Sequence, residues 1–359
     1  MHDLNGWAKV ADRLWVWDYV TSFGHYLAPF PNLRVRDDNT RLFVANHVTG
    51  IFEQDVYNTI NGELSPLSGY LNAKLLWDPH YDEERAIAEF LDGVYGKAAG
   101  PIRQYIDLLH DKVENENLHA AIWIEPQTVN YLTDDVMAKA GKLWDQAEAA
   151  VSNSPKTLEQ VQIARLSYDC AVLEKQRGAG GLGEFIVDHE TLTAKTRPEY
   201  IQQVKRFFET ARHAKVTRIN EGRTSLDQYE AGFSKSIEGR SLKFTPLAPV
   251  SNVVGQPGVV CKYYEGKWQD LPDFKTMTPA KVRVVEEINL GLSDRKTMFA
   301  LQYTGYITVP HNGLYTFCTN SNDGSQLFIG DTLVADNGGL HAAKIRSGFI
   351  ALKAGMHPI

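Results

Sequence analysis

The last part of the chain, residues 258–359, is a succession of short β-rich segments separated by turn residues. The segments lie at 259–264, 297–309, 313–321, 325–329, 332–336 and 344–352. Turn residues stand between them, as in Pro310-His311-Asn312-Gly313 and Ile329-Gly330-Asp331. Many short strands at this spacing are typical of antiparallel sheets packed face to face. The pattern therefore predicts a β-sandwich.

Six motifs in this part, in order, resemble the PA-14 module, which is named after the anthrax protective antigen. They are Gly258-Val-Val-Cys-Lys-Tyr-Tyr-Glu-Gly, Tyr303-Thr-Gly-Tyr-Ile-Thr-Val-Pro, Gly313-Leu-Tyr-Thr-Phe, Ser321-Asn-Asp-Gly-Ser-Gln-Leu-Phe-Ile, Leu333-Val-Ala-Asp-Asn and Gly348-Phe-Ile-Ala-Leu-Lys-Ala-Gly-Met-His. The resemblance implies a carbohydrate-binding-type module. It also implies further strands after Ile359, so we expect the sandwich to be incomplete at its C-terminus.

The fourth of these motifs contains a turn near its start, and this turn is a candidate calcium site. Sugar-binding members of the family use an Asp-Asp pair and calcium, and the corresponding residues here are Asn322 and Asp323. An Asn carbonyl can still bind a hard cation, but one negative charge is lost, and weak binding is expected. The alternative is that Asp323 and Gly324 form a hairpin turn. Both interpretations stay open at the level of sequence.

The N-terminal part, residues 1–80, alternates segments of strand and helix character. Strands are predicted at 14–19 and 48–52, and helices at 37–46 and 67–76. This order predicts parallel strands joined by right-handed crossovers. Two such units are too few for a barrel, which takes eight. We therefore expect the chain to begin late in a larger (β/α) barrel domain.

The predicted fold class is a multidomain α/β plus all-β protein. It comprises a partial barrel end at 1–80, a helical region at 81–243, a linker at 244–257 and the antiparallel sandwich at 258–359. Apolar residues recur at helical spacing in segments such as 83–95 and 101–114, and this pattern predicts the helices of the region 81–243.

Two carboxylates follow the predicted parallel strands. Asp18 ends the first strand and Glu53 ends the second, where barrel enzymes place catalytic groups. Glycoside hydrolysis needs such a pair, one as acid and one as base or nucleophile. The alternatives are structural: Asp18 caps the next helix or pairs with an Arg, and Glu53 forms a salt bridge with Arg34, Arg36 or Arg41.

Residues 1–120 resemble a bacterial domain of unknown function that is related to α-glucuronidases and hexosaminidases. The motifs are Val16-Trp-Asp-Tyr, Tyr26-Leu-Ala-Pro-Phe-Pro-Asn-Leu, Val48-Thr-Gly-Ile-Phe-Glu-Gln, Tyr70-Leu-Asn-Ala-Lys-Leu-Leu-Trp-Asp-Pro and Phe90-Leu-Asp-Gly-Val-Tyr-Gly-Lys-Ala-Ala. The resemblance implies that Asp18 and Glu53 hold and activate water in an inverting reaction. The acid would precede Met1, so we expect the fragment alone to be inactive. Six residues are candidate sugar-binding groups: Trp15, Trp17, Tyr19, His25, Gln54 and Tyr57.

Two functions from different classes follow. The first is a secreted polysaccharide-degrading glycoside hydrolase with an appended binding module, located in the periplasm or outside the cell. The second is a non-catalytic glycan-binding or surface protein with a degenerate barrel. The partner in either case is a polysaccharide or oligosaccharide, and no catalytic cofactor is expected. A net charge of −7 without a basic run argues against nucleic acid, and no apolar stretch approaches the roughly 20 residues that span a bilayer.

Overall fold

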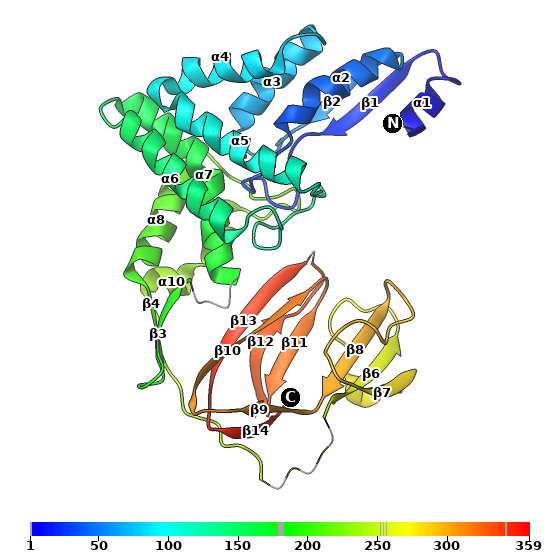
Figure 1. Cartoon of the computed structure of the whole chain (residues 1–359), viewed down its shortest axis with the longest axis vertical. Coiled ribbons are helices and arrows are strands. Elements are labelled where there is room, and N and C mark those ends of the chain that lie inside the picture. The colour runs from blue at the N-terminus through cyan, green and yellow to red at the C-terminus, as the bar shows by residue number, and fades with distance from the viewer. Residues whose placement is uncertain (1, 179–182, 252, 254, 256, 342) are drawn as a thin grey trace. The chain divides into compact units, whose positions relative to one another are not determined.

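A computed structural model describes residues 2–178, 183–251, 253, 255, 257–341 and 343–359 (Figure 1). The chain divides into two compact units. The first comprises residues 1–174 and 202–237, and the second comprises residues 175–201 and 238–359. Each unit therefore combines two separate stretches of sequence, and the expected boundaries at residues 80 and 243 fall inside the units.

The first unit begins with a short helix and a parallel pair of strands. Helix α1 spans His2–Trp7, β1 spans Leu14–Tyr19 and β2 spans Val48–Gln54. The two strands are parallel, and α2 (Arg36–Ala45) joins them and lies against β2. The predicted parallel pairing is thus present. Among the described residues the sheet has these two strands alone, so a barrel is not shown.

Helices supply most of the core of the first unit. They are α3 (Ser65–Trp77), α4 (Glu83–Tyr95), α5 (Ala99–Asn115), α6 (Asp134–Ala150), α7 (Pro155–Gly178), α8 (Pro198–His213), α9 (Leu226–Ala231) and α10 (Ser234–Glu238), with short 3₁₀ turns at Leu33–Val35 and Gly96–Ala98. The Asp82 side chain accepts a hydrogen bond from the Arg85 amide and so caps α4. Leu71, Ile102 and Trp144 are fully buried in the shared core. Each such side chain stabilises the fold by about 1.5–3 kcal/mol.

The segment after β1, residues 20–28, organises the carboxyl ends of the two strands. Most of its side chains are buried. Its backbone pairs with three other parts of the first unit: Val20 N donates to Gln54 O at 3.1 Å, Phe23 N to Ile122 O at 2.7 Å and Tyr26 N to Ile219 O at 2.7 Å. The loops 55–63, 121–125 and 219–224 therefore converge beside the strand ends.

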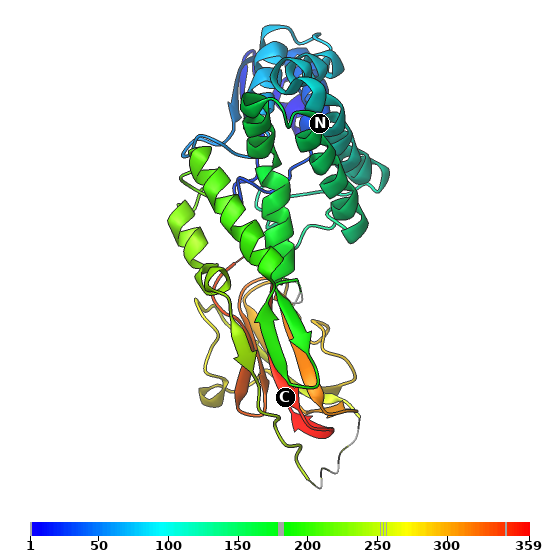
Figure 2. The same ribbon diagram turned by 90° about the vertical axis from the view of Figure 1, so that its left-hand side faces the viewer.

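The second unit contains a three-stranded antiparallel sheet of β3 (Phe185–Asp188), β4 (Thr193–Thr196) and β5 (Ser241–Lys243), with the β3–β4 hairpin drawn in green in Figure 2. The sequence predicted a mostly helical region over 81–243 and did not anticipate these strands. They are three or four residues long, which is too short for a clear alternation, and β5 comes from a distant part of the chain.

The sandwich follows in the second unit. Its strands are β6 (Val259–Glu265), β7 (Lys281–Val285), β8 (Phe299–Thr304), β9 (Tyr306–Val309), β10 (Gly313–Ser321), β11 (Ser325–Ile329), β12 (Thr332–Asn337), β13 (Lys344–Leu352) and β14 (Gly355–Pro358), with a 3₁₀ turn at Phe274–Thr276. The pairs β10–β13, β11–β12, β9–β14, β6–β7 and β6–β8 are all antiparallel. Ile329, Ile350 and Leu352 are among its buried residues. These antiparallel sheets are consistent with the predicted sandwich.

The segment expected to be a linker, residues 244–257, is bound to this sheet over its first part. Leu247 N donates to Ala351 O at 2.9 Å, and Val250 N donates to Met356 O at 2.9 Å. Three of its later residues, 252, 254 and 256, lie outside the described part of the chain.

Cys170 and Cys261 are buried free thiols, whereas Cys318 is exposed. No helix in the described part of the chain is long and apolar enough to cross a membrane.

Candidate functional site

Asp18 and Glu53 are register partners on the parallel strands β1 and β2. Because side chains alternate along a strand, they project from the same face, as do the half-buried Val16 and Ile51. This face is the one that α2 covers. The structure therefore brings the two predicted catalytic carboxylates together.

The opposite face of the strand pair is open and aromatic. Trp15, Trp17 and Phe52 are exposed to 79%, 63% and 53%. The rings of Trp17 and Phe52 meet edge to face with centroids 5.0 Å apart. The Trp17 indole donates to Gln54 Oε1 at 2.7 Å, which places Gln54 on this face. We call Trp15, Trp17, Tyr19, Phe52 and Gln54 the aromatic face.

The predicted sugar-binding aromatics and the predicted catalytic pair thus lie on opposite faces of the sheet. Side chains alternate between the two faces along a strand. Trp15, Trp17 and Tyr19 therefore point to one face and Asp18 to the other, although all four belong to β1. The carboxylates and the aromatic face can meet only around the strand ends.

The pKa of the Glu53 carboxyl is raised above its usual value. Burial raises the pKa of its carboxyl to about 7, and the nearby Asp18 carboxylate adds to the rise, whereas the Arg36 guanidinium opposes it. Asp18 accepts a hydrogen bond from the Tyr19 amide at 2.9 Å. A carboxyl that titrates near neutral pH beside an acidic neighbour has the character of a general acid or base.

Arg36 is the buried cation behind this pair. Its guanidinium donates to Ser68 Oγ at 2.8 Å, to Asn72 Oδ1 at 2.9 Å and to Val20 O at 3.3 Å, while its Nε has no hydrogen-bond partner. Ser68 Oγ in turn donates to Asp55 Oδ2 at 2.8 Å. Arg36 therefore binds α2 to α3 and to the end of β1, and it acts on the carboxylates through its field.

The alternative for Glu53 was a salt bridge to Arg34, Arg36 or Arg41, and neither Arg34 nor Arg41 pairs with it. Arg34 instead pairs with Asp107, Asp111 and Glu114 of α5, and Arg41 pairs with Asp37 and Asp38 within α2.

The remaining predicted sugar-binding residues, His25 and Tyr57, occupy different environments. His25 is buried, its Nδ1 accepts from the Leu27 amide at 3.3 Å, and its Nε2 lies 3.5 Å from Cys170 Sγ. Tyr57 is exposed, and its hydroxyl donates to Glu221 Oε1 at 3.3 Å. His25 is thus an interior residue, whereas Tyr57 stands at the surface near the strand ends.

Four charged residues near the strand ends were not identified from the sequence: Arg36 as a network centre, Asp55, Glu63 and Glu221. Burial raises the pKa of Glu63 to about 8, with Arg36 opposing. Asp55 directly follows Glu53 and Gln54, so its position after a strand was a usable signal. Glu221 had none, because 164 residues separate it from Tyr57.

In the sandwich, Asn322 and Asp323 form the tip between β10 and β11. Asp323 has φ 61°, a left-handed conformation that Asp tolerates. Its amide donates to His341 O at 2.9 Å, and its Oδ1 accepts from the His341 amide at 3.3 Å. Asp323 therefore bridges two loops, as the turn interpretation requires.

The described residues contain no group of three or more His, Cys, Asp or Glu side chains that could hold a metal ion. Asp323 supplies one carboxylate, which is already bound to a backbone amide. A calcium site takes six to eight oxygen ligands, which can include amide, backbone carbonyl and water oxygens, so the site at Asn322 and Asp323 stays a prediction.

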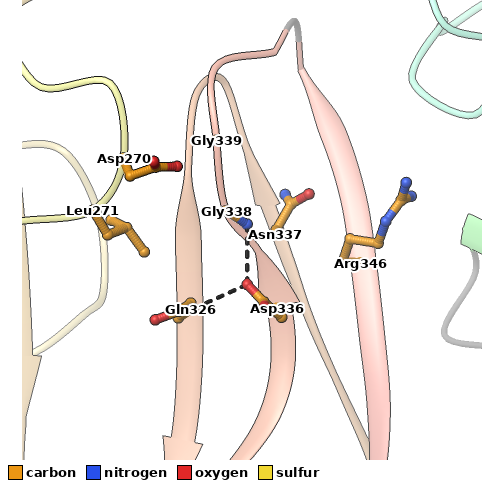
Figure 3. Close-up of a pocket in the computed structure, with 8 residues that line it drawn as sticks. All are labelled: Asp270, Leu271, Gln326, Asp336, Asn337, Gly338, Gly339 and Arg346. Atoms are coloured by element: carbon orange, nitrogen blue, oxygen red, sulfur yellow. Dashed lines mark hydrogen bonds between the residues drawn. The ribbon is translucent and has the colours of Figure 1, made fainter. Parts of the chain in front are cut away.

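A polar pocket of about 530 Å³ lies beside this loop (Figure 3). Asp270 and Leu271 lie on one side of it and Gln326 and Asp336 on the other. Asp336 Oδ1 accepts from Gln326 Nε2 at 3.0 Å and from the Gly338 amide at 3.2 Å. Carboxylate and amide groups of this kind are suited to the hydroxyl groups of a sugar.

Comparison with protein families assigns two parts of the chain. Residues 1–107 match a family described as a domain of unknown function (DUF4838), and residues 255–359 match the PA14 domain. No curated protein matches the chain. The PA14 domain is a carbohydrate-binding-type module, which is consistent with a glycan-related protein.

Proposed function

We propose that this chain binds glycans as part of a carbohydrate-active protein that acts in the periplasm or outside the cell. The match of residues 255–359 to the PA14 domain carries the proposal. The polar pocket of the sandwich supports it, because its carboxylate and amide groups can exchange hydrogen bonds with sugar hydroxyls.

The parallel strands support a larger sheet around β1 and β2. A two-stranded sheet is marginally stable in water, and parallel sheets are normally covered on both faces. Here one face carries exposed tryptophans. We assign this pair to a larger parallel sheet, and we assign sugar binding to Trp15, Trp17 and Tyr19 where this face stays open to solvent.

Hydrolysis of glycosidic bonds is the second candidate function. The neighbouring positions of Asp18 and Glu53, with the pKa of Glu53 near 7, favour it. In this proposal Glu53 is the base that activates water and Asp18 holds the water. The test is turnover of aryl glycosides by the full-length protein, and not by this chain alone, with and without Glu53→Gln, which should lower kcat by roughly 100-fold or more. Equal kcat values would show that Glu53 takes no part in the reaction.

Glycan binding is tested by electrophoresis of the whole chain through gels that contain one polysaccharide each. The panel comprises xyloglucan, arabinoxylan and galactomannan as neutral polymers and polygalacturonate as an anionic one. Retarded migration in at least one gel, relative to a gel without polysaccharide, is expected. Unchanged migration in every gel would contradict the proposed function.

A further inference from the structure

Two side chains beside the strand ends, the exposed Trp123 and the half-buried Glu221, extend the aromatic face of the first unit. We infer that Trp123, Glu221 and Tyr57 form a subsite at the carboxyl ends of β1 and β2 that binds a neutral sugar residue. The inference rests on the proposed glycan-binding function and adds to it a location, two residues and the charge class of the ligand.

The backbone fixes Glu221 near the end of β1. The Glu221 amide donates a hydrogen bond to Phe23 O at 3.1 Å. Two residues earlier in the same turn, Ile219 O accepts a hydrogen bond from the Tyr26 amide. The turn 219–224 therefore runs alongside the buried segment that follows β1. Hydrogen bonds of this kind hold a loop in one position without help from its side chains.

The side chain of Glu221 is oriented by the loop after β2. Tyr57 donates its hydroxyl to Glu221 Oε1, whereas Oε2 has no hydrogen bond among the described residues. Burial raises the pKa of the Tyr26 phenol, and the charges of Glu221 and Asp55 add to the rise, so both carboxylates lie near it. Glu221 thus presents one oxygen that can accept a sugar hydroxyl.

A row of rings connects Trp123 to the aromatic face. The Trp17 and Tyr19 centroids are 6.5 Å apart, Tyr19 and Phe23 are 5.4 Å apart, and Phe23 and Trp123 are 6.1 Å apart. Phe23 is buried, while Trp123 is about half exposed. The buried ring therefore supports an exposed ring on each side, in Tyr19 and Trp123.

The composition of this surface favours a sugar as the occupant. The large apolar side chains exposed on the open face of β1 and β2 are all aromatic: Trp15, Trp17, Tyr19 and Phe52. Aromatic rings offer flat apolar faces, and a few placed polar groups supply orientation, as in small-molecule sites. Glu221 and the hydroxyl of Tyr57 are polar groups of this kind.

The charge of Glu221 selects against acidic sugars. A uronate carboxylate next to Glu221 would repel it, whereas a neutral hydroxyl donates a charge-assisted hydrogen bond. The ligand is therefore a neutral glycan and not a polyuronate.

The experiment titrates the whole chain with the neutral and anionic polysaccharides of the panel and follows tryptophan fluorescence. Trp123→Ala and Glu221→Gln should each weaken binding of the neutral polymer at least about tenfold, which corresponds to about 1.4 kcal/mol. The matched controls are Trp77→Ala, an exposed tryptophan of α3, and Glu209→Gln, an exposed carboxylate of α8. Both controls should bind as the wild type does.

The outcomes separate the two proposals. If the wild type binds a neutral polymer and Trp123→Ala and Glu221→Gln bind equally well, the subsite is refuted and the glycan-binding function stands. If the wild type binds polygalacturonate alone, the charge argument is refuted. If it binds no polymer, both proposals fail. Glu221→Gln replaces one carboxylate oxygen by an amide nitrogen of similar size. Its binding result therefore tests the subsite even if Trp123→Ala lowers the melting temperature.

Discussion

Trp15 on β1 lies so close over Gly50 on β2 that a β-carbon at position 50 would be 2.5 Å from the indole Cε3. The two residues are register partners in the parallel sheet. The absence of a side chain at Gly50 lets the indole rest against the neighbouring strand and keep 79% of its surface exposed. An exposed indole supported in this way can stack on a sugar ring.

Gly50→Ala should displace the indole of Trp15 at little cost in stability, below about 1 kcal/mol, because the exposed ring can turn away. Near-UV circular dichroism should change, and binding of a neutral polysaccharide should weaken. Gly69→Ala, a helical site with open space around it, is the control and should leave both unchanged. An unaltered near-UV spectrum for Gly50→Ala would contradict the contact.

Arg36→Met should lower the free energy of unfolding by about 3 kcal/mol or more, because it removes a buried cation and leaves its acceptors unpaired. Arg41→Met, on the same helix, loses surface ion pairs and should cost less than about 1 kcal/mol. Urea denaturation of the two variants measures the difference. Equal losses would show that the Arg36 network does not hold α2 against α3.

Stability should fall as the pH rises from about 6.5 to 8.5. Burial raises the pKa of Glu63 to about 8 and that of Glu53 and Glu83 to about 7. The folded protein therefore keeps protons that the unfolded chain loses near pH 4.5, so the free energy of unfolding decreases through this interval. Burial lowers the pKa of His110 to about 4, which opposes the trend only below about pH 6.5.

Melting temperatures at pH 6.5 and pH 8.5 measure this dependence. Glu63→Gln should reduce the difference between the two values, because the amide does not titrate, and Glu116→Gln, an exposed site, should leave it unchanged. A melting temperature that rises with pH over this interval would contradict the raised pKa values of Glu53, Glu63 and Glu83.

Local patterns predicted much of the fold. The runs 14–19, 313–321, 325–329 and 344–352 are strands with those bounds, because alternating or β-branched segments between turn residues specify a strand locally. The strands β3 and β4 escaped prediction because they are too short for a clear alternation, and β5 because its partner β4 is distant in the sequence. The separation of the aromatic face from Asp18 and Glu53 was predictable from alternation alone, whereas the approach of Glu221 to Tyr57 depends on the tertiary fold.

Asp323→Ala should lower the melting temperature of the protein by the same amount in calcium and in chelator. The substitution removes the hydrogen bond to the His341 amide and places Ala at a positive φ, at a cost of about 1 kcal/mol. Asp331→Ala, an exposed aspartate in the turn between β11 and β12, is the control and should have little effect. Calorimetry in both buffers decides between the two interpretations. A loss confined to calcium-containing buffer would establish a cation site at Asn322 and Asp323.

Isothermal titration of the whole chain with the neutral polysaccharides of the panel tests the central claim most directly. Wild type and Trp77→Ala should bind at least one of them with equal affinity. The double variant Trp15→Ala with Trp17→Ala should bind more weakly, because it removes both tryptophans from the aromatic face and leaves the sandwich pocket intact. Absence of binding heat for the wild type with every polymer would contradict the account.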